Sequence, residues 1–93
     1  MIYHWAAFAV ANHLKGDFEQ LYKALASIEN LRLSAEMKPV EINHLMLYRA
    51  IAFRDGQQFQ KMYDDLKRNV EKILDKDLWH EYLFKACQKL KKT

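Results

Sequence analysis

The sequence is poor in the residues that interrupt helices, with two glycines and one proline among 93 residues. Glycine allows left-handed turns and proline breaks helical hydrogen bonding, so a chain with few of either favours long helices. The single Cys87 leaves no intrachain disulfide. A small chain without such a crosslink is typical of a reducing compartment. We therefore expect a helical protein of the cytoplasm.

Long hydrophobic runs and a dominant charge are also missing. The apolar stretch from Trp5 to Val10 is too short to span a bilayer and lacks the basic leader of a signal peptide. Fifteen Lys and Arg residues against twelve Asp and Glu give a net charge of +3, well short of a nucleic-acid-binding surface. Because 51% of the residues are hydrophobic, the chain can bury a small core, and its length limits it to one domain.

Apolar residues recur at helical spacing in five segments. The pattern predicts helices over about residues 2–15, from residue 17 until it fades at residue 30, and over 39–55, 57–74 and 77–91. The third of these is apolar almost all round, with only Arg49 interrupting it, so we expect it to be buried on both sides. Leu45 and Ile51 are its predicted core residues.

The expected helix ends carry suitable residues. Gly16 suits a left-handed end of the first helix, and Gly56 closes the third. Asp17 and Gln20 resemble a capping box for the second helix. Pro39 fits the first turn of the third helix, and Asp77 can cap the fifth. These signals mark where the helices begin and end, and we expect no strand between them.

The chain also repeats itself. Four residues recur 41 positions later, each set following a helix that ends at a glycine: Phe18, Leu21, Tyr22 and Leu25 become Phe59, Met62, Tyr63 and Leu66. With Trp5, Phe8 and Ala9, the first copy follows the 34-residue tetratricopeptide pattern. We expect one all-α domain over residues 1–93, a short right-handed α-solenoid of helical hairpins. It comprises repeat one over about 1–33, a linker over 30–38 that holds a seven-residue insertion, repeat two over 39–74 and a partial third repeat over 77–93.

Three stretches resemble a known family. The run Trp5-Ala-Ala-Phe-Ala-Val-Ala-Asn-His-Leu-Lys-Gly-Asp-Phe-Glu, the run Glu41-Ile-Asn-His-Leu-Met-Leu-Tyr-Arg-Ala and the run Glu71-Lys-Ile-Leu-Asp-Lys resemble the auxiliary subunit of the NatA amino-terminal acetyltransferase complex. The resemblance implies a helical scaffold that wraps around a separate catalytic subunit, orients it and places it near the ribosome. Members of that family are several times longer, so the chain would be an internal fragment, a split gene product or a divergent short relative.

No residue carries a catalytic, metal or cofactor role in this interpretation. Gly16 and Gly56 are isolated, so a glycine-rich cradle for the acetyl donor is missing. The four histidines and Cys87 lack the spacing of metal ligands. The first helix instead offers apolar residues, such as Val10, where peptide-binding repeats carry polar ones. Such a surface suits a partner helix, and the predicted partner contacts are Val10, His13, Leu47 and Arg54. Packing against a neighbouring repeat explains them equally well.

Two further surfaces suggest partners. The lysine-rich end is either a helix terminus that complements its own dipole or a contact with ribosomal RNA; it comprises Lys85, Lys89, Lys91 and Lys92. The two end helices would lack neighbours in an array, which predicts self-association through one of them. On the fifth helix we expect uncovered side chains among Trp79, Tyr82, Leu83 and Leu90. The rival functions are therefore a generic tetratricopeptide adaptor for helices or peptides and a small RNA-associated protein.

Overall fold

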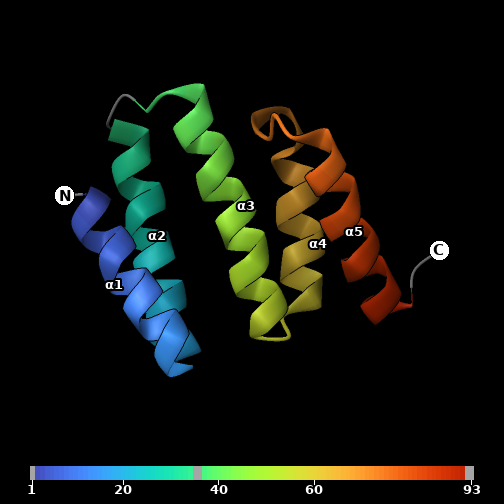
Figure 1. Ribbon diagram of the computed structural model, residues 1–93, viewed down its shortest axis with the longest axis horizontal. Helices are drawn as coiled ribbons and strands as arrows, with labels where there is room; N and C mark the ends of the chain where they lie inside the picture. Colours follow the sequence, from blue (N-terminus) through green and yellow to red (C-terminus); the bar gives the residue numbers. More distant parts are fainter. Residues whose placement is uncertain (1, 35–36, 92–93) are drawn as a thin grey trace. The chain divides into compact units, whose positions relative to one another are not determined.

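The computed structural model describes residues 2–34 and 37–91 and divides the chain into two compact units, Met1–Met37 and Lys38–Thr93. The described residues form five α-helices and one short 3-10 helix, with no strand, and helices adjacent in sequence pack together within each unit (Figure 1). This confirms the all-α class and the number of helices. The helices are α1 (Ile2–Lys15), α2 (Phe18–Ser34), α3 (Pro39–Asp55), α4 (Phe59–Arg68), η1 (Val70–Lys72) and α5 (Lys76–Leu90).

The first unit is an antiparallel hairpin of α1 and α2 (Figure 1). Gly16 ends α1 with a φ of +78°, as its sequence position predicted. The Asp17 Oδ1 atom accepts the backbone N–H of Gln20 at 3.2 Å, which is one half of the expected capping box. The helix α2 continues to Ser34, beyond the point where the apolar pattern fades. An ion pair between Glu29 and Arg32, three residues apart, supports this added turn.

The core of this hairpin follows the predicted stripe. Four of its side chains are at most 3% exposed: Leu21, Ala24, Leu25 and Ile28. From α1 they meet Ala9, which is fully buried, and Asn12, which is 6% exposed. The Asn12 side chain donates from Nδ2 to the Phe8 carbonyl at 2.9 Å, so a polar residue enters the core with its amide satisfied.

The second unit contains α3, α4 and α5, which alternate in direction (Figure 1). Leu45 is 8% exposed, as predicted for the core, whereas Ile51 is only half-buried. From α4, Met62 and Leu66 are at most 1% exposed, and from α5 Trp79 is 9% exposed. The indole Nε1 of Trp79 donates to the Leu66 carbonyl at 2.8 Å. This bond fixes α5 against α4.

The fourth helix is shorter than the sequence predicted. It ends at Arg68 instead of Leu74, because the Asn69 side chain donates to the Asp65 carbonyl at 2.9 Å and competes with the helical backbone. A 3-10 turn follows, and Ile73 is extended with its side chain buried. The Asn43 Oδ1 atom on α3 then accepts the backbone N–H of Leu74 at 2.7 Å, which secures this connection.

One capping prediction also needs correction. The fifth helix is capped by Asp75, which accepts the Leu78 backbone N–H at 3.1 Å, and Asp77 lies two residues later, within the first turn. Gly56 closes α3 as predicted, with a φ of −85°, which is not the left-handed conformation. The next residue, Gln57, takes it instead, with a φ of 59°. At this turn the glycine ends the helix, and the residue after it takes the left-handed conformation.

The helix ends repeat along the chain with the period of the sequence. At the end of α1 the N–H of Gly16 donates to the His13 carbonyl at 3.1 Å, and the N–H of Asp17 donates to the Asn12 carbonyl at 2.9 Å. The same two bonds recur 41 positions later, from Gln57 to Arg54 at 3.0 Å and from Gln58 to Phe53 at 2.8 Å. Such paired bonds around a left-handed residue define a helix-terminating motif.

The first of these bonds recurs once more at the end of α5. Lys91 has a φ of 59° and donates its backbone N–H to the Gln88 carbonyl at 3.1 Å. It lies 34 positions after Gln57. The shorter interval matches the shorter second helix, since α2 has 17 residues and α4 has 10. The described residues with a positive φ are these three, so α1, α3 and α5 each end at a residue in the left-handed conformation.

These helix ends give a prediction about stability. A left-handed conformation costs a residue with a side chain about 1–2 kcal/mol, so Gln57→Gly should stabilise the protein by about 0.5–1 kcal/mol after the entropy of glycine is subtracted. Gly16→Ala should destabilise it by about 1 kcal/mol, because a Cβ there meets no atom within 4 Å and only the backbone is strained. Urea unfolding followed by circular dichroism measures both changes.

The matched control is Gln60→Gly, because Gln60 is exposed within α4 and has helical backbone angles. This change should destabilise the protein by about 1 kcal/mol. A stabilising effect of glycine at Gln60, or a destabilising one at Gln57, would contradict the left-handed assignment.

Candidate functional site

The first helix presents the largest group of exposed apolar side chains in the described part of the chain. Its inner side packs on α2 through Ala9 and Asn12. Its outer side exposes Phe8 by 41%, Val10 by 48% and Leu14 by 84%, and Ala7 and Ala11 lie exposed between them. No acidic residue occurs anywhere in α1. We call the side formed by Ala7, Phe8, Val10, Ala11 and Leu14 the α1 outer face.

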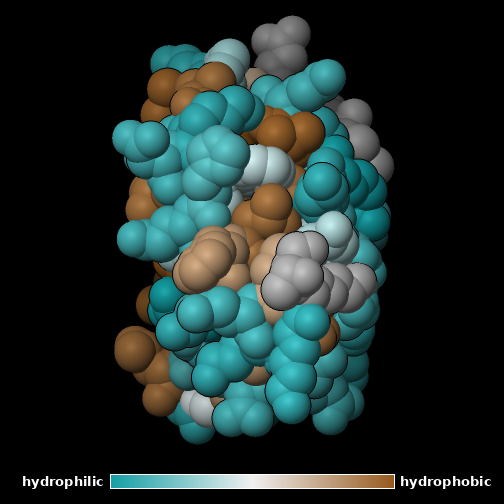
Figure 2. All heavy atoms as spheres, turned by 90° about the vertical axis from the view of Figure 1, so that its right-hand side faces the viewer, coloured by the Kyte–Doolittle hydropathy of each residue, from teal (hydrophilic) through white to brown (hydrophobic). Residues whose placement is uncertain are grey.

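The fifth helix has the opposite character. Trp79 and Ala86 are buried and three further apolar side chains on the same helix are half-buried, namely Tyr82, Leu83 and Leu90. The predicted uncovered apolar surface on this helix is thus largely covered. The other side of the helix exposes the charged residues Asp77, Glu81 and Lys85. Phe84 is the one large apolar side chain exposed on this side of α5, by 65%. Figure 2 shows this side of the molecule as mostly hydrophilic around a small hydrophobic area.

The four predicted partner contacts have different surroundings. Val10 belongs to the α1 outer face and is available to a partner. His13 is half-buried, with its ring centroid 6.2 Å from that of Phe18. Leu47 is only 9% exposed on α3. Arg54 is partly exposed and its Nε atom lies 3.1 Å from the Asp55 carboxylate, so a partner would meet a paired guanidinium there.

The predicted basic patch lies toward the C-terminal end of α5. Lys85 and Lys89 are exposed one turn apart. The Lys89 ammonium lies 5.9 Å from the centre of the Phe59 ring on α4, a cation–π distance. Lys91 is exposed at the left-handed C-cap, and Lys92 lies outside the described residues. One of the lysines therefore already has an aromatic partner within the protein.

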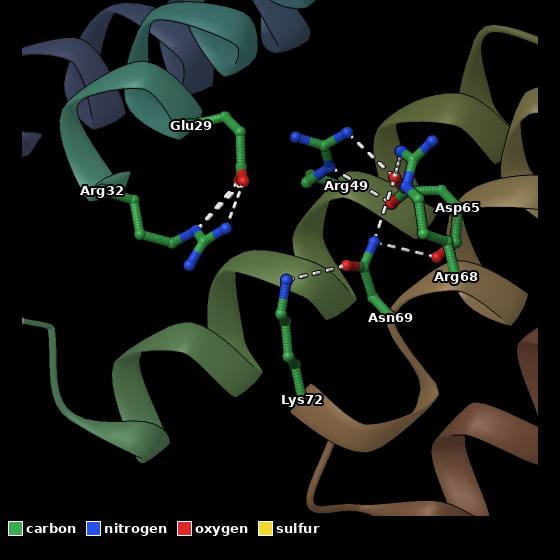
Figure 3. Close-up of polar contacts among 7 residues, drawn as sticks. All are labelled: Glu29, Arg32, Arg49, Asp65, Arg68, Asn69 and Lys72. Atoms are coloured by element: carbon green, nitrogen blue, oxygen red, sulfur yellow. Dashed lines mark hydrogen bonds and ion pairs between the residues drawn. The ribbon is translucent and has the colours of Figure 1, made fainter. Parts of the chain in front are cut away.

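Sequence reasoning missed a polar cluster around Asp65, whose side chain is 4% exposed (Figure 3). Arg49 on α3 binds it with two atoms, from Nε to Oδ2 at 3.1 Å and from Nη2 to Oδ1 at 2.9 Å. Arg68 donates to Oδ1 at 2.8 Å and Asn69 at 3.2 Å. Lys72 Nζ lies 3.5 Å from the Asn69 Oδ1 atom. The carboxylate joins α3 to α4 and, with every polar atom satisfied, is a structural feature.

Two titratable groups are perturbed elsewhere. The hydrogen bond from Arg32 to Glu29 raises the pKa of the Arg32 guanidinium, against the opposing effect of burial. Burial, followed by the charge of Asp55, raises the pKa of the Tyr48 hydroxyl above its ordinary value of 10.0. Both shifts move these groups further from neutral pH, so Arg32 is charged and Tyr48 neutral under physiological conditions. Neither is tuned for proton transfer near pH 7.

The remaining searches for a site gave no candidate within residues 2–34 and 37–91. No three His, Cys, Asp or Glu side chains in these ranges lie together as a metal site. None of the helices there is long and apolar enough to cross a membrane. Comparisons with protein-family models, curated proteins and solved structures found no match for this chain. The α1 outer face therefore is the candidate functional site.

Proposed function

We propose that this chain is a non-catalytic scaffold that binds another protein through tetratricopeptide-like repeats, as the auxiliary subunit of a NatA-type amino-terminal acetyltransferase complex. The observation that supports a repeat scaffold is the recurrence of one helix-ending motif at Gly16 and Gln57, with its left-handed residue and one of its two bonds found again at Lys91. The second interval, 34 residues, is the length of a tetratricopeptide repeat. Each interval corresponds to one helical hairpin in this arrangement.

In the proposed scaffold α1, α3 and α5 are the first helices of three successive repeats, and α2 and α4 are the second helices. Stacked hairpins of this kind would form a right-handed α-solenoid. The burial of equivalent residues supports the register: Ala9 and Ala50 are both fully buried, as are Leu21 and Met62, each pair 41 positions apart. The extra turns of α2 then account for the longer first repeat.

The α1 outer face supplies the proposed partner surface. An apolar helix face without acidic residues fits the apolar side of a partner helix better than a peptide's charged terminus. Val10 would contact the partner there. Of the other expected contacts, Arg54 on α3 is partly exposed, whereas His13 is half-buried and Leu47 is only 9% exposed. The acetyl-transfer chemistry would belong to the catalytic subunit, and the complex would work in the cytoplasm near the ribosome.

Copurification tests the proposal. The chain should retain an amino-terminal acetyltransferase catalytic subunit when the two are coexpressed, and Val10→Glu should reduce the recovery at least about tenfold by placing a charge in an apolar contact. The matched control is Val40→Glu, since Val40 is exposed by 55% on α3 and lies outside the proposed contacts. Control and test variants that behave alike would contradict the proposed surface.

Two other outcomes would replace the proposal. If unrelated amphipathic helices bind as tightly as the catalytic subunit, the chain is a generic adaptor. If the subunit is not recovered and the chain binds RNA with a steep dependence on salt, the lysine-rich end is the functional surface.

A further inference from the structure

We propose that two copies of this chain associate through the side of α5 that carries Phe84, with the two α5 helices antiparallel. The inference rests on one part of the proposed function, the equivalence of α1, α3 and α5 in the repeat, and needs no acetyltransferase partner. Residues at intervals of three and four lie on one side of a helix. We call the side formed by Asp77, His80, Glu81, Phe84, Cys87, Gln88 and Lys91 the α5 open side.

The repeat indicates that a helix covers this side. Aligned on the left-handed helix ends, the positions equivalent to Phe84 are Ala9 on α1 and Ala50 on α3, and both alanines are fully buried. Ala9 belongs to the core that α1 forms with the antiparallel α2 (Figure 1). Phe84 is instead 65% exposed. The α5 open side therefore lacks, within the described residues, the antiparallel helix that covers the same side of α1.

The neighbouring positions agree with this comparison. Four more residues of the α5 open side have equivalents on both other helices, and all eight equivalents are buried or half-buried. On α5 three of the four are exposed and Cys87 is half-buried. The equivalent sets are Trp5, Ala6, Asn12 and His13 on α1, Met46, Leu47, Phe53 and Arg54 on α3, and His80, Glu81, Cys87 and Gln88 on α5.

The exposed charges of α5 favour a second α5 as the covering helix. Asp77 and Glu81 are exposed before Phe84, and Lys85 and Lys91 are exposed after it. An antiparallel helix with the same order of charges brings acidic residues against basic ones at both ends. A parallel helix with that order would place like charges together, which is unfavourable.

No other described helix offers this order of exposed charges. The helix α1 has no acidic residue, and α4 mixes the two signs along its exposed side. On α2 the exposed Glu19 and Lys23 already pair with each other at 3.4 Å, and α3 exposes Asp55 alone among its Asp, Glu, Lys and Arg residues. The first residue of α5, Lys76, does not disturb the order, because its Nζ atom donates to the Ile73 carbonyl at 2.6 Å.

The spacing along the α5 open side gives the register. Phe84 lies seven residues from Asp77 and seven from Lys91. A two-fold axis through Phe84 therefore places Asp77 of each copy opposite Lys91 of the other. The two Phe84 rings meet on the axis, where an aromatic pair adds to the burial of apolar area. Glu81 then lies beside Gln88 of the other copy, whose amide can donate to the carboxylate.

Exchanging the two end charges tests this register. Asp77→Lys should raise the dissociation constant of the dimer at least about tenfold, because it sets two positive charges opposite each other. Lys91→Asp should do the same with two negative charges. A mixture of the two variants should form a heterodimer about as tightly as the natural chain, since each changed position then faces the opposite charge. Sedimentation velocity over about a hundredfold range of concentration measures each dissociation constant.

The control for these variants is Asp64→Lys, which makes the same change of charge at an exposed position of α4. It should leave the dissociation constant unchanged. A natural chain that is monomeric at every concentration would overturn the proposal and leave the α5 open side to solvent or to a different helix. A mixture of the Asp77→Lys and Lys91→Asp chains that fails to associate would overturn it as well.

Disulfide trapping tests the position of the axis. In a Cys87→Ser background, which removes the natural thiol, Phe84→Cys should give a disulfide-linked dimer on oxidation, because the axis brings the two side chains at position 84 together. Gln60→Cys in the same background is the control, since Gln60 is exposed on α4, and it should stay mostly monomeric. Equal crosslinking at the two positions would contradict the proposed axis. A dimer that forms without recovery of any catalytic subunit would overturn the proposed function alone.

Discussion

Replacing Asp65 by alanine is expected to destabilise the unit Lys38–Thr93 by about 3–5 kcal/mol. The Arg49 side chain is only 13% exposed and makes a two-atom ion pair with this carboxylate. Without Asp65 its positive charge remains largely buried and has lost both of those bonds. The Asn69 amide also loses its bond to Oδ1. Urea unfolding followed by the ellipticity of the helices measures the loss.

The neighbouring residue provides a matched control. Asp64 is exposed and accepts a bond from Gln60 at 3.0 Å, so Asp64→Ala should change the free energy of unfolding by no more than about 0.5 kcal/mol. Arg68 also binds Asp65 but is 68% exposed, and Arg68→Ala should cost at most about 1 kcal/mol. Equal effects at positions 64 and 65 would contradict the buried ion pair.

A double substitution separates the burial of a charge from the loss of packing. Arg49→Met combined with Asp65→Leu removes both charges and keeps apolar volume, which for buried pairs is often neutral or stabilising. We therefore expect the double variant to recover most of the stability lost in Asp65→Ala. A double variant as unstable as the single one would show that the carboxylate acts through Asn69 and the end of α4 instead.

The sequence contained part of the signal for this ion pair. Arg49 stood out as the only interruption of an apolar helix, which implies a buried charge in need of a partner. Asp65 follows Met62 by three residues and so lies close to the apolar stripe of α4. Periodicity alone does not tell which of two adjacent acids, Asp64 or Asp65, points inward. The pairing depends on how α3 packs against α4, which a single helix does not encode.

The sequence predicts a helix end well where one local residue fixes the backbone. It predicts the end poorly where a side chain from another part of the chain fixes it. Pro39 and Gly16 each fix a local backbone conformation, and α3 and α1 begin and end as expected. The early end of α4 depends on Asn69, an ordinary residue in a polar pattern, and on Asn43, which binds the backbone of Leu74 from another helix. No local sequence pattern predicts such a long-range hydrogen bond.

The candidate site was only partly foreseen for a similar reason. The sequence predicted that Val10 lies on the surface, and its side chain is exposed in the structure. Both ends of the chain had been expected to leave apolar residues uncovered. Trp79 is instead buried through its bond to the Leu66 carbonyl. Helical periodicity gives the width of an apolar stripe, whereas the choice of which stripe is covered depends on tertiary packing.

The second large effect is expected from two equivalent leucines. Leu25 and Leu66 lie 41 positions apart, are 3% and 1% exposed, and belong to different units. Replacing either by alanine removes buried methyl groups and leaves a cavity, at a cost of about 2–5 kcal/mol. The exposed neighbours Lys23 and Lys67 are the controls, and their alanine variants should stay within about 0.5 kcal/mol.

The two tryptophans allow each unit to be followed separately, because Trp5 lies in the first unit and Trp79 in the second. In a Trp5→Phe background the fluorescence of Trp79 should report the loss caused by Leu66→Ala as a lower urea midpoint. In a Trp79→Phe background, the fluorescence of Trp5 should show that Leu25→Ala unfolds the first unit more completely than Leu66→Ala unfolds the second. The reason is that a single helical hairpin of this size has little stability to lose. We therefore expect α1 and α2 to be largely unfolded in Leu25→Ala before urea is added, with the emission of Trp5 already shifted to the red. A native-like Trp5 spectrum with an unchanged midpoint in that variant would show that Leu25 is not a core residue of the hairpin.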